Sequence, residues 1–414
     1  MGILSSQFRE AVSKHKDSRM KEESTPSVAY STGFLNFDFM NGTVVHVKDS
    51  TRDFKYYSVG IQDGCLVMLI GRSGCGKTTW AVQTAANIVR PFKNGCIFHD
   101  DIEGGLTEYR KEILTNFHGE ELHTKYISRN TGITAENFYE RLRMIHDLKI
   151  FNRENYEYDT GLFDQNGNRL FKLEPTVYIL DSLALLMPAQ YTEEEELSGS
   201  MSATAAAKTN SMSFKRIIPM LKAANIILLM INHINKKIDI NPMQRTKSQV
   251  SYLKQDESLP GGNTPIYLTN ILLRFDDNTK LKPDEAFGIA GNMVDISLVK
   301  SRNNRAGKSC TLVFNQDRGF DAELSLFVML KNAKRISGTG AYLYFSGLPD
   351  VKFSQKTFKQ KLRESAELRQ EFINEVMYML KNDLDSTDDS LDNDSFTDND
   401  SIMTDIMNQI NPNL

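Results

Sequence analysis

A glycine-rich segment between an apolar run and a helix-like stretch has the residue types that bind nucleotide phosphates. The run Leu66 to Ile70 leads into a complete Walker A motif, which consists of Gly71, Arg72, Ser73, Gly74, Cys75, Gly76, Lys77 and Thr78 and continues into Thr79. The glycines allow backbone N–H groups to curl around phosphates, Lys77 can reach the β- and γ-phosphate oxygens, and Thr78 can offer its hydroxyl to Mg²⁺. A glycine-rich turn that binds no nucleotide is the alternative, but a chance match in this strand–loop–helix context is rare. The sequence therefore predicts a site for ATP and Mg²⁺.

Two acidic positions can complete a hydrolytic site. The apolar run Thr176 to Leu180 ends at Asp181, the position of a Walker B carboxylate, which reaches the metal ion, usually through water. Hydrolysis also needs a group that positions or deprotonates a water molecule, and the best candidate is Glu103, about one βα unit after the phosphate loop. Asp100 and Asp101 are rivals that position alone does not exclude. An exposed loop carboxylate without a role is the further alternative for Glu103.

The elements that must position these residues alternate between short apolar runs and longer amphipathic stretches from Val28 to about Ala333. This alternation is typical of an α/β fold with a mostly parallel sheet covered by helices. Ligands of such sheets bind at the carboxyl ends of the strands, where the residues above fall. The predicted strands are Cys65 to Ile70, Gly95 to His99, Thr176 to Leu180, Ile226 to Asn232, Ile271 to Phe275, Met293 to Val299 and Cys310 to Phe314. A hairpin is expected between Phe163 and Leu173 as an addition to this core.

The composition indicates a soluble, cytoplasmic protein. Of the 414 residues 40% are hydrophobic and 25% charged, which suits one large core with smaller lobes at its ends. The longest apolar runs, such as Ile226 to Ile231, are far shorter than the roughly 20 residues of a membrane helix, and Met1 to Arg19 lacks the apolar stretch of a secretory signal. No CxxC spacing links the four cysteines, so we expect reduced thiols and no structural metal at Cys65, Cys75, Cys96 and Cys310.

Four regions are expected along the chain. Residues 1–30 form an N-terminal arm with a helix at Gln7 to Lys21, 31–335 the ATPase core, 336–382 a small C-terminal α/β lobe, and 383–414 an acidic, disordered tail. The tail holds nine aspartates between Asp383 and Asp405 and no lysine or arginine, so the rest of the chain is net basic although the formal charge is −4. Such a tail can compete with nucleic acid for a basic surface, and a merely solubilising end is the alternative.

The order of these motifs resembles the RecA recombinases of bacteria and their phages over roughly Tyr30 to Leu380. The segments that carry the resemblance besides the phosphate loop are Ser31 to Asp38, Phe98 to Leu106 and Ile179 to Leu185. The resemblance implies a RecA-like P-loop ATPase core. It assigns the catalytic glutamate to Glu103 and implies that Tyr109 stacks on the adenine.

The same resemblance implies two DNA-binding loops. Met201 falls where the first loop presents a methionine, and a flexible surface loop is the alternative. His233 stands where bacterial members have a glutamine that senses the γ-phosphate, and a buried core histidine is the alternative. The second loop would provide basic residues for DNA phosphates and an apolar wedge between bases, unless it is only a solvated loop. Its residues with an expected role are Lys236, Lys237, Ile238, Arg245, Lys247, Lys254, Gly261, Gly262 and Asn263.

Lys300 and Arg302 match a pair of family lysines that cross the filament interface and contact the neighbour's nucleotide. There they would stabilise charge on the transferred phosphoryl group, so ATP hydrolysis would require assembly. Arginine at position 302 keeps the charge and changes the geometry. The chain departs from the bacterial pattern in residues 43–58, in the hairpin near Gly167, and in having Asp276, Asp277 and Asp295 where basic pairs of a secondary DNA site are expected. These departures look more like a phage-encoded member and leave the capture of duplex DNA open.

Together with the phosphate-loop motif, the resemblance implies an ATP-dependent DNA strand-exchange recombinase. Such a protein is a DNA-dependent ATPase that releases ADP and phosphate, assembles into a helical filament on single-stranded DNA and pairs it with homologous duplex; single-strand-binding or loader proteins are further expected partners. A hexameric DNA helicase on the same ATPase fold is the alternative, although the arm of residues 1–30 is short for the partner-binding domain that such a motor would carry. A regulatory ATP-binding scaffold is a third hypothesis, against which Glu103 and the Lys300 and Arg302 pair argue.

Overall fold

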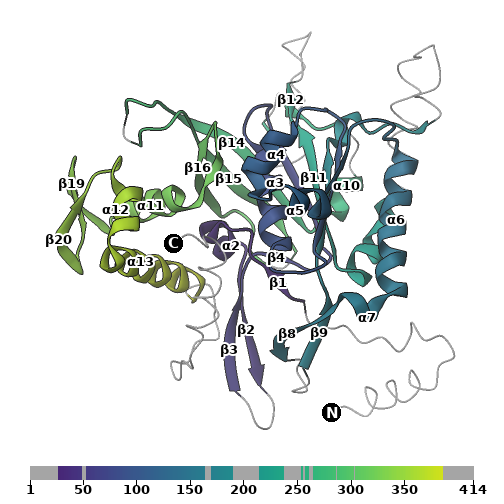
Figure 1. The fold of residues 1–414 in the computed structure, drawn as a ribbon, viewed down its shortest axis with the longest axis horizontal. Helices are drawn as coiled ribbons and strands as arrows, with labels where there is room; N and C mark the ends of the chain where they lie inside the picture. Colours follow the sequence, from purple (N-terminus) through teal and green to yellow (C-terminus); the bar gives the residue numbers. More distant parts are fainter. Residues whose placement is uncertain are drawn as a thin grey trace.

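The core of the protein is a nine-stranded, mostly parallel β-sheet with the strand order β17-β16-β15-β14-β5-β11-β10-β6-β7 (Figure 1). Six neighbouring strands, β14, β5, β11, β10, β6 and β7, run parallel to one another. Strands β15, β16 and β17 each run antiparallel to their neighbours. In this order their bounds are Gly319–Asp321, Ser309–Asn315, Gly291–Ser301, Ile271–Leu281, Leu66–Gly71, Ile226–His233, Thr176–Asp181, Cys96–Asp101 and Tyr126–Arg129. The computed structural model describes residues 27–48, 53–163, 169–189, 214–236, 253–254, 257–260, 264–285, 287–302 and 304–385. The predicted α/β fold is confirmed at this level.

Alternate residues of the central strands pack on opposite faces of the sheet. On one face Val67 and Leu69 of β5 belong to the same buried cluster as Trp80 of α3 (Lys77–Val89). On the other face Leu66, Met68 and Ile70 pack in the cluster that contains Phe138 of α6 (Ala135–Phe151) and the helix at 214–223. Because both faces are covered, the central strands β5, β10 and β11 are apolar along most of their length, which is why the sequence indicates their positions.

The remaining helices and hairpins surround this sheet. Further helices are α2 (Leu35–Met40), α4 (Glu108–Thr115), α5 (Glu120–Lys125), α7 (Arg153–Tyr156) and α10 (Thr264–Leu268), together with the 3₁₀ turn Leu183–Leu185. Two-stranded antiparallel pairs are formed by β1 (Ala29–Tyr30) with β4 (Ile61–Gln62), β2 (Thr43–Lys48) with β3 (Asp53–Ser58), β8 (Glu157–Phe163) with β9 (Arg169–Leu173), and β12 (Asn235–Lys236) with β13 (Glu257–Ser258). The hairpin expected between Phe163 and Leu173 agrees with the antiparallel pairing of β8 with β9, and β2 and β3 pair in the same way.

A smaller unit packs against one side of the core, at the left in Figure 1. It contains β18 (Ile336–Thr339), β19 (Tyr342–Phe345), β20 (Leu348–Phe353), α12 (Phe358–Glu364) and α13 (Ala366–Asp385), and α11 (Ala322–Asn332) joins it to the sheet. Its buried cluster includes Phe345, Phe353, Phe358 and Phe372, and also Phe39 of α2. This unit therefore combines a three-stranded antiparallel sheet with two helices.

Several predicted boundaries change in the structure. β6, β10 and β11 each extend past their apolar run to include Asp101, Asp181 and His233, so polar residues that were placed after the strands lie at their ends. β7 was not predicted, because only Tyr126 of its four residues is buried. Helix α13 runs to Asp385, so the first residues of the predicted tail are helical.

Some expectations fall outside the described residues. These are the helix at Gln7 to Lys21 and the tail beyond residue 385. Within the described ranges, none of the helices combines the length and apolar character needed to cross a membrane. All four cysteines are free thiols, with Cys65 and Cys75 buried and Cys96 and Cys310 half-buried.

Replacing Trp80 by alanine should destabilise the core by about 3–5 kcal/mol, because the side chain is fully buried and a cavity would form. The indole makes edge contacts with Phe37 and Phe275, at ring-centroid distances of 5.1 and 5.7 Å. Urea unfolding followed by circular dichroism measures the change. Tyr342→Ala is the control, since this tyrosine is 68% exposed and its loss should change stability by no more than about 0.5 kcal/mol. Equal effects of the two substitutions would contradict the described packing.

Candidate nucleotide-binding site

The glycine-rich loop joins the end of β5 to the start of α3, as the motif requires. Gly76 is the residue before the helix and adopts a left-handed conformation with φ of 86°, and a Cβ atom there would lie 2.8 Å from the ring of Phe320. No side chain caps the helix, so the first backbone N–H groups of α3 are available to an anion at this end. Glycine at this position is therefore required both by the backbone conformation and by the space.

Lys77 is held inside the loop by its own backbone. The side-chain ammonium donates hydrogen bonds to the carbonyl oxygens of Gly71, at 3.0 Å, and of Arg72, at 2.7 Å, and the residue is only 4% exposed. A buried cation needs such partners, and phosphate oxygens can replace the carbonyls at the same ammonium group. The predicted role of Lys77 in phosphate binding fits this geometry.

Asp181 and Thr78 form a donor set suited to a hard cation. The Thr78 hydroxyl donates to Oδ2 of Asp181 at 2.6 Å, and Oδ1 of Asp181 is buried without a hydrogen-bond partner. Burial raises the pKa of Asp181 to about 6, and the nearby carboxylates of Glu103 and Asp101 also raise it. A hydroxyl and a carboxylate with a free oxygen are ligands that Mg²⁺ accepts, so these residues fit the expected ion. The peptide bond between Asp181 and Ser182 is cis.

Glu103 and His233 are in direct contact although they come from different strands. Oε1 of Glu103 lies 2.6 Å from Nε2 of His233, and their side chains are 40% and 23% exposed. Glu103 follows β6, and His233 is the last residue of β11, beside Gly71 in the strand register. The structure therefore brings together the candidate base and the candidate γ-phosphate sensor at the mouth of the phosphate loop.

The rivals of Glu103 have other partners. Asp100 is 2% exposed, accepts a hydrogen bond of 2.6 Å from the Tyr178 hydroxyl and forms an ion pair with Arg141. Asp101 accepts hydrogen bonds from the backbone N–H groups of Gly104, at 2.9 Å, and Leu106, at 3.1 Å. These contacts shape the loop that carries Glu103, so the geometry favours Glu103 as the group that meets a water molecule.

Tyr109 lies on α4 with 73% of its surface exposed. An exposed ring on a helix that follows the Glu103 loop is accessible to a planar ligand. Its predicted stacking on adenine stays a prediction.

Lys300 and Arg302 lie at the opposite end of the sheet from the phosphate loop. Lys300 pairs with Leu272 of β14, which is level with Met68, and the Arg302 amide bonds to Asn270, which is level with Leu66 at the start of β5. The distance along β5 from Leu66 to Gly71 is about 16 Å at 3.3 Å per residue. These cations therefore do not share a site with the phosphate loop of their own chain.

Both cations are held by one short helix. The Lys300 ammonium donates to the carbonyl oxygens of Ile266 and Tyr267, at 3.0 and 2.8 Å, and the Arg302 guanidinium donates to Tyr267 at 2.9 Å. Partial burial lowers the pKa of Lys300, and the positive charge of Arg302 lowers it further. The pair presents two adjacent positive charges, which suits an anion from outside the chain.

The predicted DNA-binding residues fall almost wholly outside the described residues. This is true of Met201, Lys237, Ile238, Arg245, Lys247, Gly261, Gly262 and Asn263. Lys236 is described as part of β12, which pairs with Glu257 of β13. The second loop therefore starts from a short antiparallel ribbon that directly follows His233.

An ion-pair network that includes Glu257 of this ribbon was not predicted from the sequence. Glu257 is 1% exposed and accepts two hydrogen bonds from the Arg274 guanidinium, at 2.8 and 3.1 Å. Arg274 also bonds to Asp276, and Arg72 of the phosphate loop lies 3.9 Å from Glu257. The signal in the sequence is a single arginine within the apolar strand of Ile271 to Phe275, because a charge in a buried strand requires a partner.

These hydrogen bonds change the acidity of the pair. Burial alone would raise the pKa of Glu257, but the bonds from Arg274 and the Lys254 amide hold it below its ordinary value of 4.5. The hydrogen bonds to the carboxylates of Asp276, which has the larger effect, and of Glu257 raise the pKa of Arg274. The network is therefore ionised at neutral pH and connects the phosphate loop to the base of the second loop.

Comparison with known proteins does not extend these findings: no protein-family model matches the sequence, and no curated protein is significantly similar to it.

Glu257→Gln should destabilise the protein by about 3 kcal/mol, because it leaves the Arg274 guanidinium buried beside a neutral amide. Asp276→Asn is the matched control, since it removes the 44% exposed partner of the same arginine and should cost less than about 1 kcal/mol. Thermal or urea unfolding measures both. Because the pKa of folded Glu257 is depressed, its stabilisation is complete above pH 4.5 and is lost as the pH falls further, so the effect of Glu257→Gln should shrink there. Equal costs for the two variants would show that the network is not buried as described.

Proposed function

We propose that this chain is an ATP-dependent DNA strand-exchange recombinase of the RecA type that hydrolyses ATP at the contacts between protomers. The observation that carries the proposal is the contact between Glu103 and His233. It joins a group suited to activating water to the strand that leads directly into the basic loop starting at Lys236. A single contact thus lies between the candidate ATPase site and the candidate DNA-binding loop.

The binding of ATP is supported by the phosphate loop and its surroundings. The backbone N–H groups of Gly71 to Thr79 and the Lys77 ammonium would hold the phosphates, while Thr78 and Asp181 would hold Mg²⁺. The ion would neutralise charge on the phosphate oxygens. The raised pKa of Asp181 supports this assignment, because a cation at its unpartnered oxygen would favour the ionised carboxylate.

Hydrolysis would depend on Glu103 and on its bond to His233. Glu103 is an exposed carboxylate at this edge that can accept a proton from water, whereas Asp100 and Asp101 are held by other partners. In the tautomer with hydrogen on Nε2, His233 donates to Glu103 and fixes its orientation. A phosphate oxygen competing for this N–H would free the carboxylate, so ligand binding and base orientation would be linked.

The link to DNA runs through β11 and β12. His233 ends β11, and only Ile234 separates it from β12, the first strand of the ribbon below the second loop. A change in the hydrogen bond of His233 would therefore act at the base of a loop whose lysines and arginines suit DNA phosphates. Such contacts with the backbone leave the bases available for pairing with a homologous duplex.

A requirement for assembly is supported by the position of Lys300 and Arg302. The strand register separates them from the phosphate loop of their own chain, so they can contact a nucleotide only if it belongs to a neighbour. A head-to-tail arrangement of protomers has this property and produces a helical filament when it does not close. Their charges would then stabilise the phosphoryl group in the transition state.

The proposal is tested by joint-molecule formation between a single-stranded circle and a homologous linear duplex, with ATP hydrolysis followed in the same mixture. We expect exchange that requires homology and ATP, together with hydrolysis stimulated by single-stranded DNA. Lys77→Ala should abolish both, because the buried ammonium is lost from the phosphate site. Strand separation without any requirement for homology would instead support a helicase and contradict strand exchange.

The placement of Lys300 and Arg302 is tested by mixing two inactive variants. Glu103→Gln lacks the base, and the double variant Lys300→Ala with Arg302→Ala lacks the cations, so each alone should hydrolyse ATP at least about a hundredfold more slowly than the wild type. In an equimolar mixture about one interface in four would combine an intact Glu103 with intact cations from the neighbour. Recovery of a comparable fraction of wild-type activity is expected. A mixture as inactive as its components would show that the cations do not act across an interface.

A further inference from the structure

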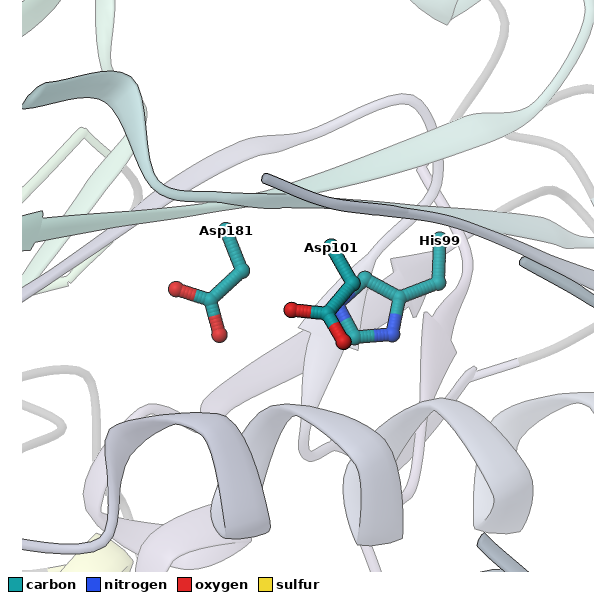
Figure 2. A group of neighbouring side chains, drawn as sticks. All are labelled: His99, Asp101 and Asp181. Atoms are coloured by element: carbon teal, nitrogen blue, oxygen red, sulfur yellow. The ribbon is translucent and has the colours of Figure 1, made fainter. Parts of the chain in front are cut away.

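A second group of metal-ligand side chains lies on the inner side of the candidate nucleotide site. His99 and Asp101 of β6 and Asp181 of β10 each offer one ligand atom, and these three atoms lie within 4.8 Å of one another. Figure 2 shows the two carboxylates and the imidazole on the same side of the strands, pointing toward the helix below them. All three residues are buried, with exposures of 1%, 5% and 2%.

His99 has one nitrogen with a partner and one without. Nδ1 lies 2.7 Å from the Tyr126 hydroxyl, whereas Nε2 is buried and has no hydrogen-bond partner. A partner on one ring nitrogen orients the imidazole and leaves the other nitrogen to bind a metal, as is usual for metal-binding histidines. Burial lowers the pKa of His99 to about 4, so the ring is neutral at pH 7. Neutral imidazole is the form that coordinates metals.

The two carboxylates also keep capacity for a cation. Oδ1 of Asp181 has no hydrogen-bond partner, while Oδ2 accepts from Thr78. Each oxygen of Asp101 accepts one backbone N–H, which leaves a second lone pair on each. Two buried carboxylates at this distance repel each other, and a cation between them and the imidazole would offset that repulsion.

We propose that His99, Asp101 and Asp181 form a binding site for a divalent transition-metal ion of the Mn²⁺ or Zn²⁺ class. Mg²⁺ prefers oxygen ligands, so the imidazole distinguishes this site from the one formed by Thr78 and Asp181 alone. Ligands on opposite sides of such an ion are about 4.2 Å apart, twice a bond of about 2.1 Å, so small side-chain rotations bring the three atoms into range. The proposal does not rest on strand exchange or on ATP hydrolysis.

Asp181 is shared with a neighbouring group of metal-ligand side chains. This neighbouring group consists of Asp181, Glu103 and His233, and its ligand atoms also lie within 4.8 Å of one another. Glu103 is exposed, so Asp181 connects the solvent-accessible group to the buried one.

The alternative for His99 is an internal hydrogen bond between Nε2–H and a carboxylate after a small movement, with no ion involved.

Manganese binding to the full-length chain, without nucleotide or DNA, separates these two arrangements. Electron paramagnetic resonance measures free Mn²⁺ during titration, in the presence of excess Mg²⁺. We expect one Mn²⁺ per chain that Mg²⁺ does not displace, and His99→Gln should weaken its affinity at least about tenfold. His118→Gln is the matched control, because this histidine is exposed and the one described hydrogen bond of its side chain is to Asn116. Its affinity for Mn²⁺ should equal that of the wild type.

Equal affinity in the wild type and His99→Gln, or complete displacement of Mn²⁺ by Mg²⁺, would overturn the proposal and leave the internal hydrogen bond. Circular dichroism establishes that His99→Gln folds. Wild-type crystals grown with Mn²⁺ give a test that needs no variant: an anomalous peak within bonding distance of His99 Nε2 is expected, and a peak only beside Thr78 would contradict the site. Since neither assay contains ATP or DNA, a failure here is distinct from a failure of the proposed recombinase activity.

Discussion

The parallel register of four neighbouring strands is the constraint on which the candidate site depends. β5, β11, β10 and β6 lie side by side in the same direction, so their last residues meet at one edge of the sheet. Gly71 is paired with His233, and Asp181 with Asp101. A shift of one strand by a single residue would turn its side chains to the opposite face and separate these groups. The apolar residues that alternate between the two covered faces fix this register, and so the hydrophobic core determines where the polar side chains meet.

The same edge concentrates charged side chains that are largely buried. Lys77 is surrounded by loop carbonyls, Asp181 has the Thr78 hydroxyl, and Glu257 binds Arg274 through two hydrogen bonds. Each of these contacts offsets the cost of burying an ionised group, and each involves a residue close to the phosphate loop. Phosphates and cations are the ligands that would replace or complement such partners. The buried oxygen Oδ1 of Asp181, which has no hydrogen-bond partner, thus agrees with a site for an anionic ligand and a metal ion.

Much of this arrangement could be predicted from the sequence because buried parallel strands appear as apolar runs and the phosphate loop has a fixed pattern. The choice among Asp100, Asp101 and Glu103 could not be predicted. Adjacent strand residues point to opposite faces, and only the packed structure shows that Asp100 contacts Tyr178 and Arg141. His99 was hidden within a predicted apolar strand, and its partner Tyr126 lies on β7, which is too short and polar to be predicted. The Glu257 and Arg274 pair was missed because it joins two strands, β13 and β14, of which the two-residue β13 has no apolar run that would predict it. The expected residues of both DNA-binding loops, apart from Lys236 and Lys254, lie outside the described residues, so those assignments stay predictions.

We propose that the state of the nucleotide reaches the second loop through His233. Hydrogen–deuterium exchange of the wild-type protein, measured with single-stranded DNA present and either a slowly hydrolysed ATP analogue or ADP, tests this most directly. We expect peptides that cover residues 234–263 to exchange more slowly with the ATP analogue than with ADP, and the exchange rate of the peptide containing Glu103 to change as well. Identical exchange of residues 234–263 in the two nucleotide states, under conditions where both nucleotides are bound, would contradict it.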